Sequence, residues 1–127
     1  TLVAAVAAVC SPLDLAAAMR DLGDRDLLHT MASMLVNEWD QHVARLEADL
    51  RERNAAQLAL DAHTVKSLFA IFHAEAARRL ALDVEQAAKA NGGDDWDRCA
   101  ELVARLVCEM AELRPAMARF VRGEIIV

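Results

Sequence analysis

The residues best suited to chemistry are His63 and Lys66, which lie three positions apart in the sequence. An exposed imidazole is partly unprotonated near neutral pH, so His63 is a competent nucleophile. If it attacked a phosphoryl group, new negative charge would lie on a helix surface, and the ammonium of Lys66 one turn later could balance it. From spacing alone, the alternative is an ordinary surface histidine.

An amphipathic helix must position this pair. Its apolar stripe repeats with spacings of four, three, four and three residues and consists of Leu58, Ala62, Val65, Phe69 and Phe72. His63 points away from this stripe, so we expect it to be exposed. Small residues surround it, and a partner could therefore approach it closely; they are Ala56, Ala59, Ser67 and Ala70.

Composition limits the class of protein. A chain of 127 residues is long enough for one domain with one core, here residues 1–127. Alanine and leucine dominate, and the alternating pattern of β-strands is absent, which indicates an all-α protein. The net charge of −6 argues against a nucleic-acid partner. The apolar opening, residues 1–10, is too short to span a bilayer, and we interpret it as a linker or an extra N-terminal segment.

Other kinds of site find little support. Gly92-Gly93 lacks the surrounding pattern of a phosphate-binding loop, and the Glu-x-x-His pairs of di-iron bundles are missing. Three cysteines without a Cys-x-x-Cys pair indicate neither a disulfide framework nor a zinc site. His29 and His42 are interpreted as ordinary surface or core-edge histidines. We therefore predict no metal, no cofactor and no nucleotide site, so any further chemistry must come from a partner.

The first two helices have clear start signals. Ser11, with Pro12 at the first helical position and Asp14 at the third, predicts a short helix that Gly23 ends. Asp24 then caps a second helix. The apolar positions of this second helix fit one long helix; they are Leu27, Leu28, Met31, Met34, Leu35, Trp39, Val43, Leu46 and Leu50.

The later helices are separated by turns of different kinds. Asn54 caps the third helix, and a single helix over residues 54–90 would be about 55 Å long, which is too long for this domain. We therefore predict a break at residues 72–74, where the apolar stripe changes phase. Asn91-Gly92-Gly93 ends the fourth helix, Asp94 caps the fifth, and Pro115 kinks or divides that helix.

These signals predict an antiparallel up-down-up-down four-helix bundle with a short extra N-terminal helix. The expected helices span about residues 12–22, 24–51, 54–73, 74–90 and 94–122.

Three segments resemble motifs of the histidine-containing phosphotransfer (HPt) domain family. They are residues 62–66 (Ala-His-Thr-Val-Lys), 74–80 (Ala-Glu-Ala-Ala-Arg-Arg-Leu) and 84–88 (Val-Glu-Gln-Ala-Ala). The similarity extends over about residues 12–120 and implies a four-helix bundle. It also implies that His63 accepts a phosphoryl group from a receiver-domain aspartate and passes it to another receiver. Lys66 matches the lysine that neighbours the phosphohistidine in this family.

Two residues depart from the family pattern. Ser67 replaces a glycine four residues after the histidine, and we expect its hydroxyl to bond back to the His63 carbonyl. His73 replaces a glycine that ends the helix, and we expect it to make the same turn with φ above zero, as a structural residue.

The resemblance gives the following functional expectations. The chain is a phosphorelay intermediate and not an enzyme, and its partners are receiver domains and a hybrid sensor histidine kinase. Because most of its apolar residues are used in one bundle, we expect a monomer, and the acidic charge and the short apolar opening argue against nucleic acid and membrane insertion. We expect the chain to act in the cytoplasm, either free-standing or as the cytoplasmic tail of a membrane-bound hybrid kinase. The receiver docks over Lys66 and over Ala56, Ala59, Leu60, Ser67 and Ala70.

Two alternatives remain at this point. One is an HPt-like module that binds receiver or kinase partners but carries no phosphoryl group. The other is a helical interaction domain in which His63 is incidental and buried under a neighbouring segment such as residues 1–10.

Overall fold

The computed structural model describes residues 13–90, 95–125 and 127. This part of the chain is helical and contains no strand, in agreement with the expected all-α class. Its helices are α2 (Leu15–Leu22), α3 (Arg25–Asn37), α4 (Trp39–Arg51), α5 (Ala55–Ile71), α6 (Glu75–Ala90) and α7 (Trp96–Val121).

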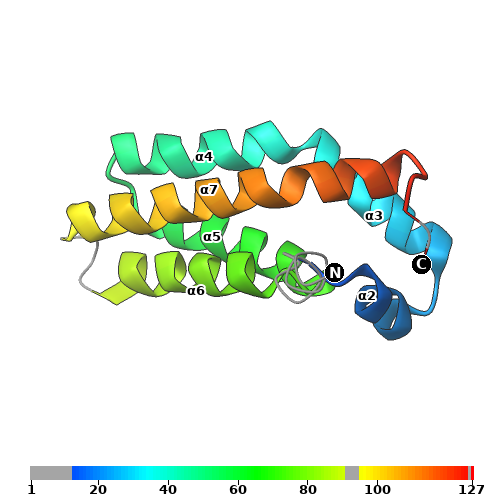
Figure 1. Ribbon diagram of the computed structural model, residues 1–127. Helices are drawn as coiled ribbons and strands as arrows, with labels where there is room; N and C mark the ends of the chain where they lie inside the picture. The colour runs from blue at the N-terminus through cyan, green and yellow to red at the C-terminus, as the bar shows by residue number, and fades with distance from the viewer. Residues whose placement is uncertain (1–12, 91–94, 126) are drawn as a thin grey trace, which may run out of the picture.

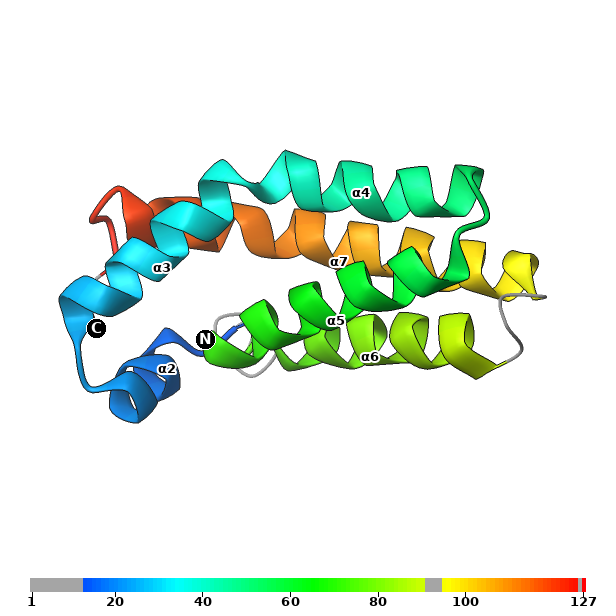
Figure 2. The ribbon, with the colours of Figure 1, turned by 180° about the vertical axis from the view of Figure 1, so that it is seen from behind.

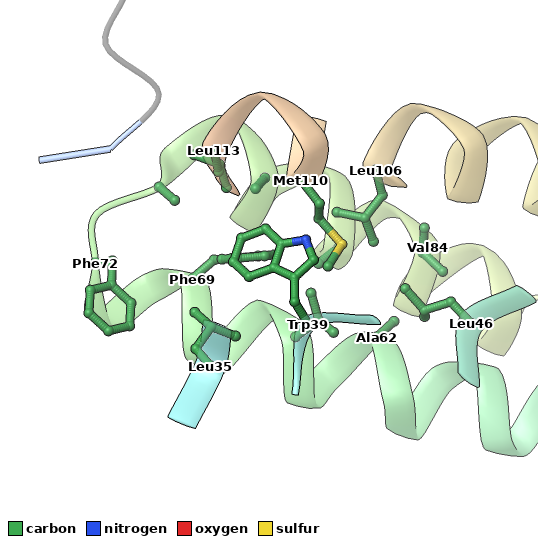
Figure 3. Packing of buried hydrophobic residues seen from close by; sticks show 14 of the residues in the cluster. Leu35, Trp39, Leu46, Ala62, Phe69, Phe72, Val84, Leu106, Met110 and Leu113 are labelled. Carbon is green, nitrogen blue, oxygen red and sulfur yellow. The ribbon is translucent and has the colours of Figure 1, made fainter. Parts of the chain in front are cut away.

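Four of the described helices lie side by side. Helices α4, α5, α6 and α7 run along one another, whereas α3 bends away from α4 and α2 lies at the same end of the molecule (Figures 1 and 2). The core lies between these helices (Figure 3), where the Trp39 and Phe69 rings meet edge to face with centroids 5.8 Å apart. Every residue of the predicted α5 stripe is buried, and the stripe therefore fixes which face of α5 is left to solvent.

The turn between α5 and α6 lies where the change of apolar phase predicted it. Helix α5 ends at Ile71, and α6 begins at Glu75. His73 occupies the turn with φ of 53°, in the left-handed region, as expected for a residue in place of a glycine. Its Nε2 lies 2.6 Å from Asp21 Oδ2, so the imidazole also joins the turn to α2. The structural role predicted for His73 is consistent with this geometry.

The prediction of one helix over residues 24–51 is wrong. The chain breaks at Glu38, which ends α3 and precedes α4. Helix α3 packs against α2 and α7, whereas α4 packs against α5 and α7, and a straight helix could not reach both sets of neighbours. Leu27 and Met34 are exposed on α3, although the apolar spacing predicts a core position for both.

Several helix ends differ from their predicted positions by a few residues. Helix α2 begins at Leu15 and not near residue 12, because Asp14 is extended and its side chain accepts a hydrogen bond from the Ala17 amide. Ser11, Pro12 and Asp94 lie outside the described residues. The cap of α7 is Asp95, and the helix continues through Pro115 without division. The caps predicted at Asp24 and Asn54 are present.

No helix in the described ranges is long and apolar enough to cross a membrane.

Candidate functional site

The predicted nucleophile, His63, stands on the solvent side of α5. Its side chain is 57% exposed, and its Nδ1 lies 3.1 Å from Oε2 of Glu85 on α6. An ionised carboxylate can only accept a hydrogen bond, so Nδ1 carries the proton. This tautomer leaves the lone pair on Nε2, the atom at which the ring can attack an electrophile.

Glu85 is the centre of the site. Its side chain is only 7% exposed, yet it accepts hydrogen bonds from His63, from Lys66 Nζ at 2.7 Å and from Lys89 Nζ at 2.9 Å. Burial alone would raise the pKa of this carboxyl, but the hydrogen bonds from Lys66 and Lys89 lower that pKa to about 2. Glu85 is therefore ionised at any pH at which the protein would work. The three hydrogen bonds fix the position of the buried Glu85 carboxylate, and the carboxylate fixes the orientation of the His63 imidazole.

Lys66 lies where the helical spacing places it, one turn after His63. Its side chain is 22% exposed, and its ammonium is bonded to Oε1 of Glu85. The cation is thus fixed beside the imidazole by the same carboxylate that orients the ring.

An apolar groove of about 570 Å³ opens beside His63, between α5 and α6. Leu60 stands at this groove with 61% of its surface exposed, whereas Ala59 is buried. The lining residues are Ala56, Ala59, Leu60, His63, Glu85 and Lys89. Three of the five residues predicted to contact a partner therefore line one groove next to the imidazole.

The other two predicted contact residues, Ser67 and Ala70, are exposed on α5 outside this groove. The Ser67 hydroxyl donates to the His63 carbonyl oxygen at 3.0 Å, the bond expected from its position four residues later. The hydroxyl is thus turned toward its own helix.

The sequence pattern does not predict the contacts of Glu85 and Lys89 with the site. Glu85 is part of the motif at residues 84–88, but the spacing within α5 gives neither residue a role. Two signals were present. Glu85 is an acid within the inward-facing stripe of α6, beside Val84 and Ala88. In addition, Lys66 and Lys89 are the two lysines of the sequence, in which every other basic residue is arginine.

Neither His29 nor His42 forms a second site of this kind. His29 is exposed on α3, and its Nε2 lies 2.7 Å from the carbonyl oxygen of Val121. His42 is buried and not at the core edge or surface as predicted, and this burial lowers the pKa of its imidazole.

Comparison with protein-family models places the Hpt domain over residues 30–119 of the chain. The chain belongs to the Hpt domain family. Hpt domains act in phosphorelays by histidine phosphotransfer, as intermediates and not as classical enzymes, and they interact with receiver domains and kinases. Comparisons with curated proteins and with solved structures gave no match. The matched range contains the whole site, from Ala56 on α5 to Lys89 on α6.

Proposed function

We propose that His63 is the phosphoacceptor of this Hpt domain. In this role it takes a phosphoryl group from the aspartyl phosphate of one receiver domain and passes it to the aspartate of another. The observation that carries the proposal is the hydrogen bond from His63 Nδ1 to the ionised Glu85, on a side chain that is otherwise exposed. It leaves the nucleophilic Nε2 free to meet a partner.

The transfer needs little chemistry from the Hpt domain. The Nε2 lone pair forms a bond to phosphorus while the bond from phosphorus to the aspartyl oxygen breaks, and the electron pair leaves on the receiver carboxylate. No proton moves, because Nδ1 keeps its proton throughout. The ring becomes a cation whose Nδ1–H still donates to Glu85, and such a charge-assisted hydrogen bond is stronger than that of the neutral ring. Lys66 offsets the charge of the phosphoryl group.

The receiver docks over the exposed face of α5. Leu60 and the groove beside it offer apolar surface on one side of His63, and Ser67 and Ala70 offer small side chains on the other. This arrangement lets a partner's active site close over the imidazole. We infer a monomeric up-down-up-down bundle that acts in the cytoplasm, with receiver domains and a hybrid sensor kinase as partners.

The test is phosphotransfer from a phosphorylated receiver domain. We expect the chain to gain a phosphoryl group that is labile in acid and stable in base, as phosphoramidate bonds to histidine are. The variant His63→Gln should gain none, and His73→Gln is the matched control that should still be labelled. Label that persists in His63→Gln would disprove the assignment. Receiver binding without label on the native chain would support the non-phosphorylated binding module instead.

A further inference from the structure

Lys89 is a second cation beside His63, and the transfer described above gives it no role. Its Nζ donates to Oε2 of Glu85 at 2.9 Å, and the same oxygen accepts from His63 Nδ1 at 3.1 Å. Lys89 also lines the groove into which His63 opens. Both lysines of the sequence are thus bound to one carboxylate at the candidate site, whereas the arginines lie elsewhere in the chain.

The two lysines lie on opposite sides of the imidazole along the helix axes. Helices α5 and α6 run side by side in opposite directions from the turn that joins them (Figures 1 and 2). Lys66 is one helical turn nearer to that turn than His63. Lys89 is one helical turn farther from it than Glu85. A group bound to Nε2 would therefore have an ammonium on either side.

The two lysine ammonium groups differ in how far they can move. The Lys66 side chain is 22% exposed, whereas the Lys89 side chain is 64% exposed. If Lys89 left Glu85, the carboxylate would keep its hydrogen bonds from Lys66 and His63. Lys89 can therefore move at small cost, whereas Lys66 is confined.

The balance of charge at the site favours movement of the Lys89 ammonium toward a phosphoryl group. With a neutral imidazole, Glu85 and the two lysines sum to a formal charge of +1. A phosphoryl group of about −2 on a ring that becomes a cation would bring this sum to zero. Without Lys89 the phosphorylated site would carry a net negative charge next to a buried carboxylate.

We propose that Lys89 is a second phosphoryl-binding residue, an inference that rests on the proposed role of His63. When Nε2 of His63 carries a phosphoryl group, the Lys89 ammonium moves from Glu85 Oε2 to a phosphoryl oxygen. Lys66 neutralises the group from the other side. Glu85 Oε2 then accepts a hydrogen bond from the Nδ1–H of the charged ring alone.

The experiment uses phosphoramidate as the phosphoryl donor, so that no receiver is needed. Phosphorus forms its bond to His63 Nε2 as the bond to the donor nitrogen breaks, and ammonia leaves. With only two lysines, the ¹⁵N-labelled chain gives two side-chain ammonium signals, and Lys89→Arg identifies the one from Lys89. We expect a ³¹P signal of phosphohistidine and, together with it, a shift of the Lys89 signal.

Kinetics supply a second readout. Lys89→Ala should slow phosphorylation by phosphoramidate by about fivefold, the effect of one exposed ion pair, and Lys89→Arg should restore most of the rate. Arg79→Ala removes one positive charge from an exposed position of the same helix and should leave the rate unchanged. Circular dichroism confirms that each variant is folded.

The outcomes separate this inference from the proposed function. If the native chain gives no phosphohistidine signal, the role of His63 and the inference both fail. If phosphohistidine forms but neither the Lys89 signal nor the Lys89→Ala rate changes, the inference alone is overturned. An equal loss of rate in Arg79→Ala would also overturn it, because the effect would then come from net charge and not from position.

Discussion

At the scale of single residues, one buried carboxylate explains the state of the whole site. Glu85 fixes the tautomer of His63, holds Lys66 and accepts from Lys89. The hydrogen bonds from these three donors offset the free energy that burial of the Glu85 charge costs. The carboxylate and the three basic groups therefore hold one another in position. The site is therefore preorganised before a partner arrives.

We predict that Glu85→Gln slows phosphorylation of His63 by phosphoramidate by about tenfold, the lower end of the effect seen when carboxylates that orient metal-binding histidines are replaced. The amide can still accept a hydrogen bond from Nδ1, but it carries no charge to stabilise the ring cation of the product. The rate is followed by ³¹P NMR. Glu101→Gln, at an exposed position of α7, is the control. A rate in Glu85→Gln equal to that of the native chain would show that the charge of Glu85 does not matter.

Residue types and spacing predicted part of this site. The exposure of His63, the position of Lys66 and the hydrogen bond from Ser67 to the His63 carbonyl could all be predicted, because each depends only on geometry within one helix. Glu85 and Lys89 belong to the next helix, and Glu85 is 22 positions from His63 in the sequence. Their contacts depend on how α5 and α6 pack, which the spacing within one helix cannot specify.

At the scale of helices and turns, His73 connects α5 to α6 in a conformation that most residues avoid. Its φ is 53°, and its imidazole contacts Asp21 on α2. Asn adopts such a conformation more readily than other non-glycine residues, whereas β-branched residues do so with difficulty.

We therefore predict that His73→Val lowers the free energy of unfolding by about 1–2 kcal/mol through backbone strain. His73→Asn loses the same contact with Asp21 without that strain and should cost less than half as much. Chemical denaturation of both variants measures the difference. Equal losses in the two variants would attribute the effect to the contact with Asp21 and not to the backbone.

A second feature at this scale is a buried acid between α4 and α5. The pKa of the Asp49 carboxyl is raised to about 7, mainly by burial and also by a hydrogen bond with Asp61 and the negative charge of Asp61. A folded-state pKa above the unfolded value of 3.8 gives stability that is present below pH 4 and is lost as the pH rises through about 7.

Asp49→Asn should remove this loss of stability at higher pH, because the amide side chain does not ionise. We predict that the variant is more stable than the native chain at pH 8, by about 2 kcal/mol, and that the gain shrinks as the pH falls to 5. Denaturation at both pH values measures it, with Asp83→Asn on α6 as the control. Parallel stability curves for Asp49→Asn and the native chain would contradict the prediction.

At the scale of the whole molecule, the helical class and most helix boundaries could be predicted from caps and apolar spacing. The break at Glu38 could not be predicted, because the apolar spacing continues across it. Its cause lies in the helices against which α3 and α4 pack. Residues before the break pack on α2 and α7, and residues after it pack on α5 and α7. The exposure of Leu27 and Met34 was not predicted either.

Among the described residues, the exposed large apolar side chains are Leu60 on α5 and Leu27 and Met34 on α3, and of these three Leu60 adjoins His63. Leu60, 61% exposed, stands at the groove between α5 and α6, whereas Met34, 56% exposed, lies on α3. If the receiver docks around His63, then it buries Leu60 and leaves Met34 in water. Exposed side chains contribute little to folding, so their replacement tests docking with little effect on stability.

We predict that Leu60→Ala weakens binding of a receiver domain by about tenfold, the effect of losing an apolar contact that becomes buried in a complex. Met34→Ala removes a side chain of similar size and exposure from α3 and should leave the affinity unchanged. Calorimetric titration of both variants with the same receiver gives the comparison. If Met34→Ala weakened binding as much as Leu60→Ala, the docking face would have to include α3, and the groove beside His63 would not be its centre.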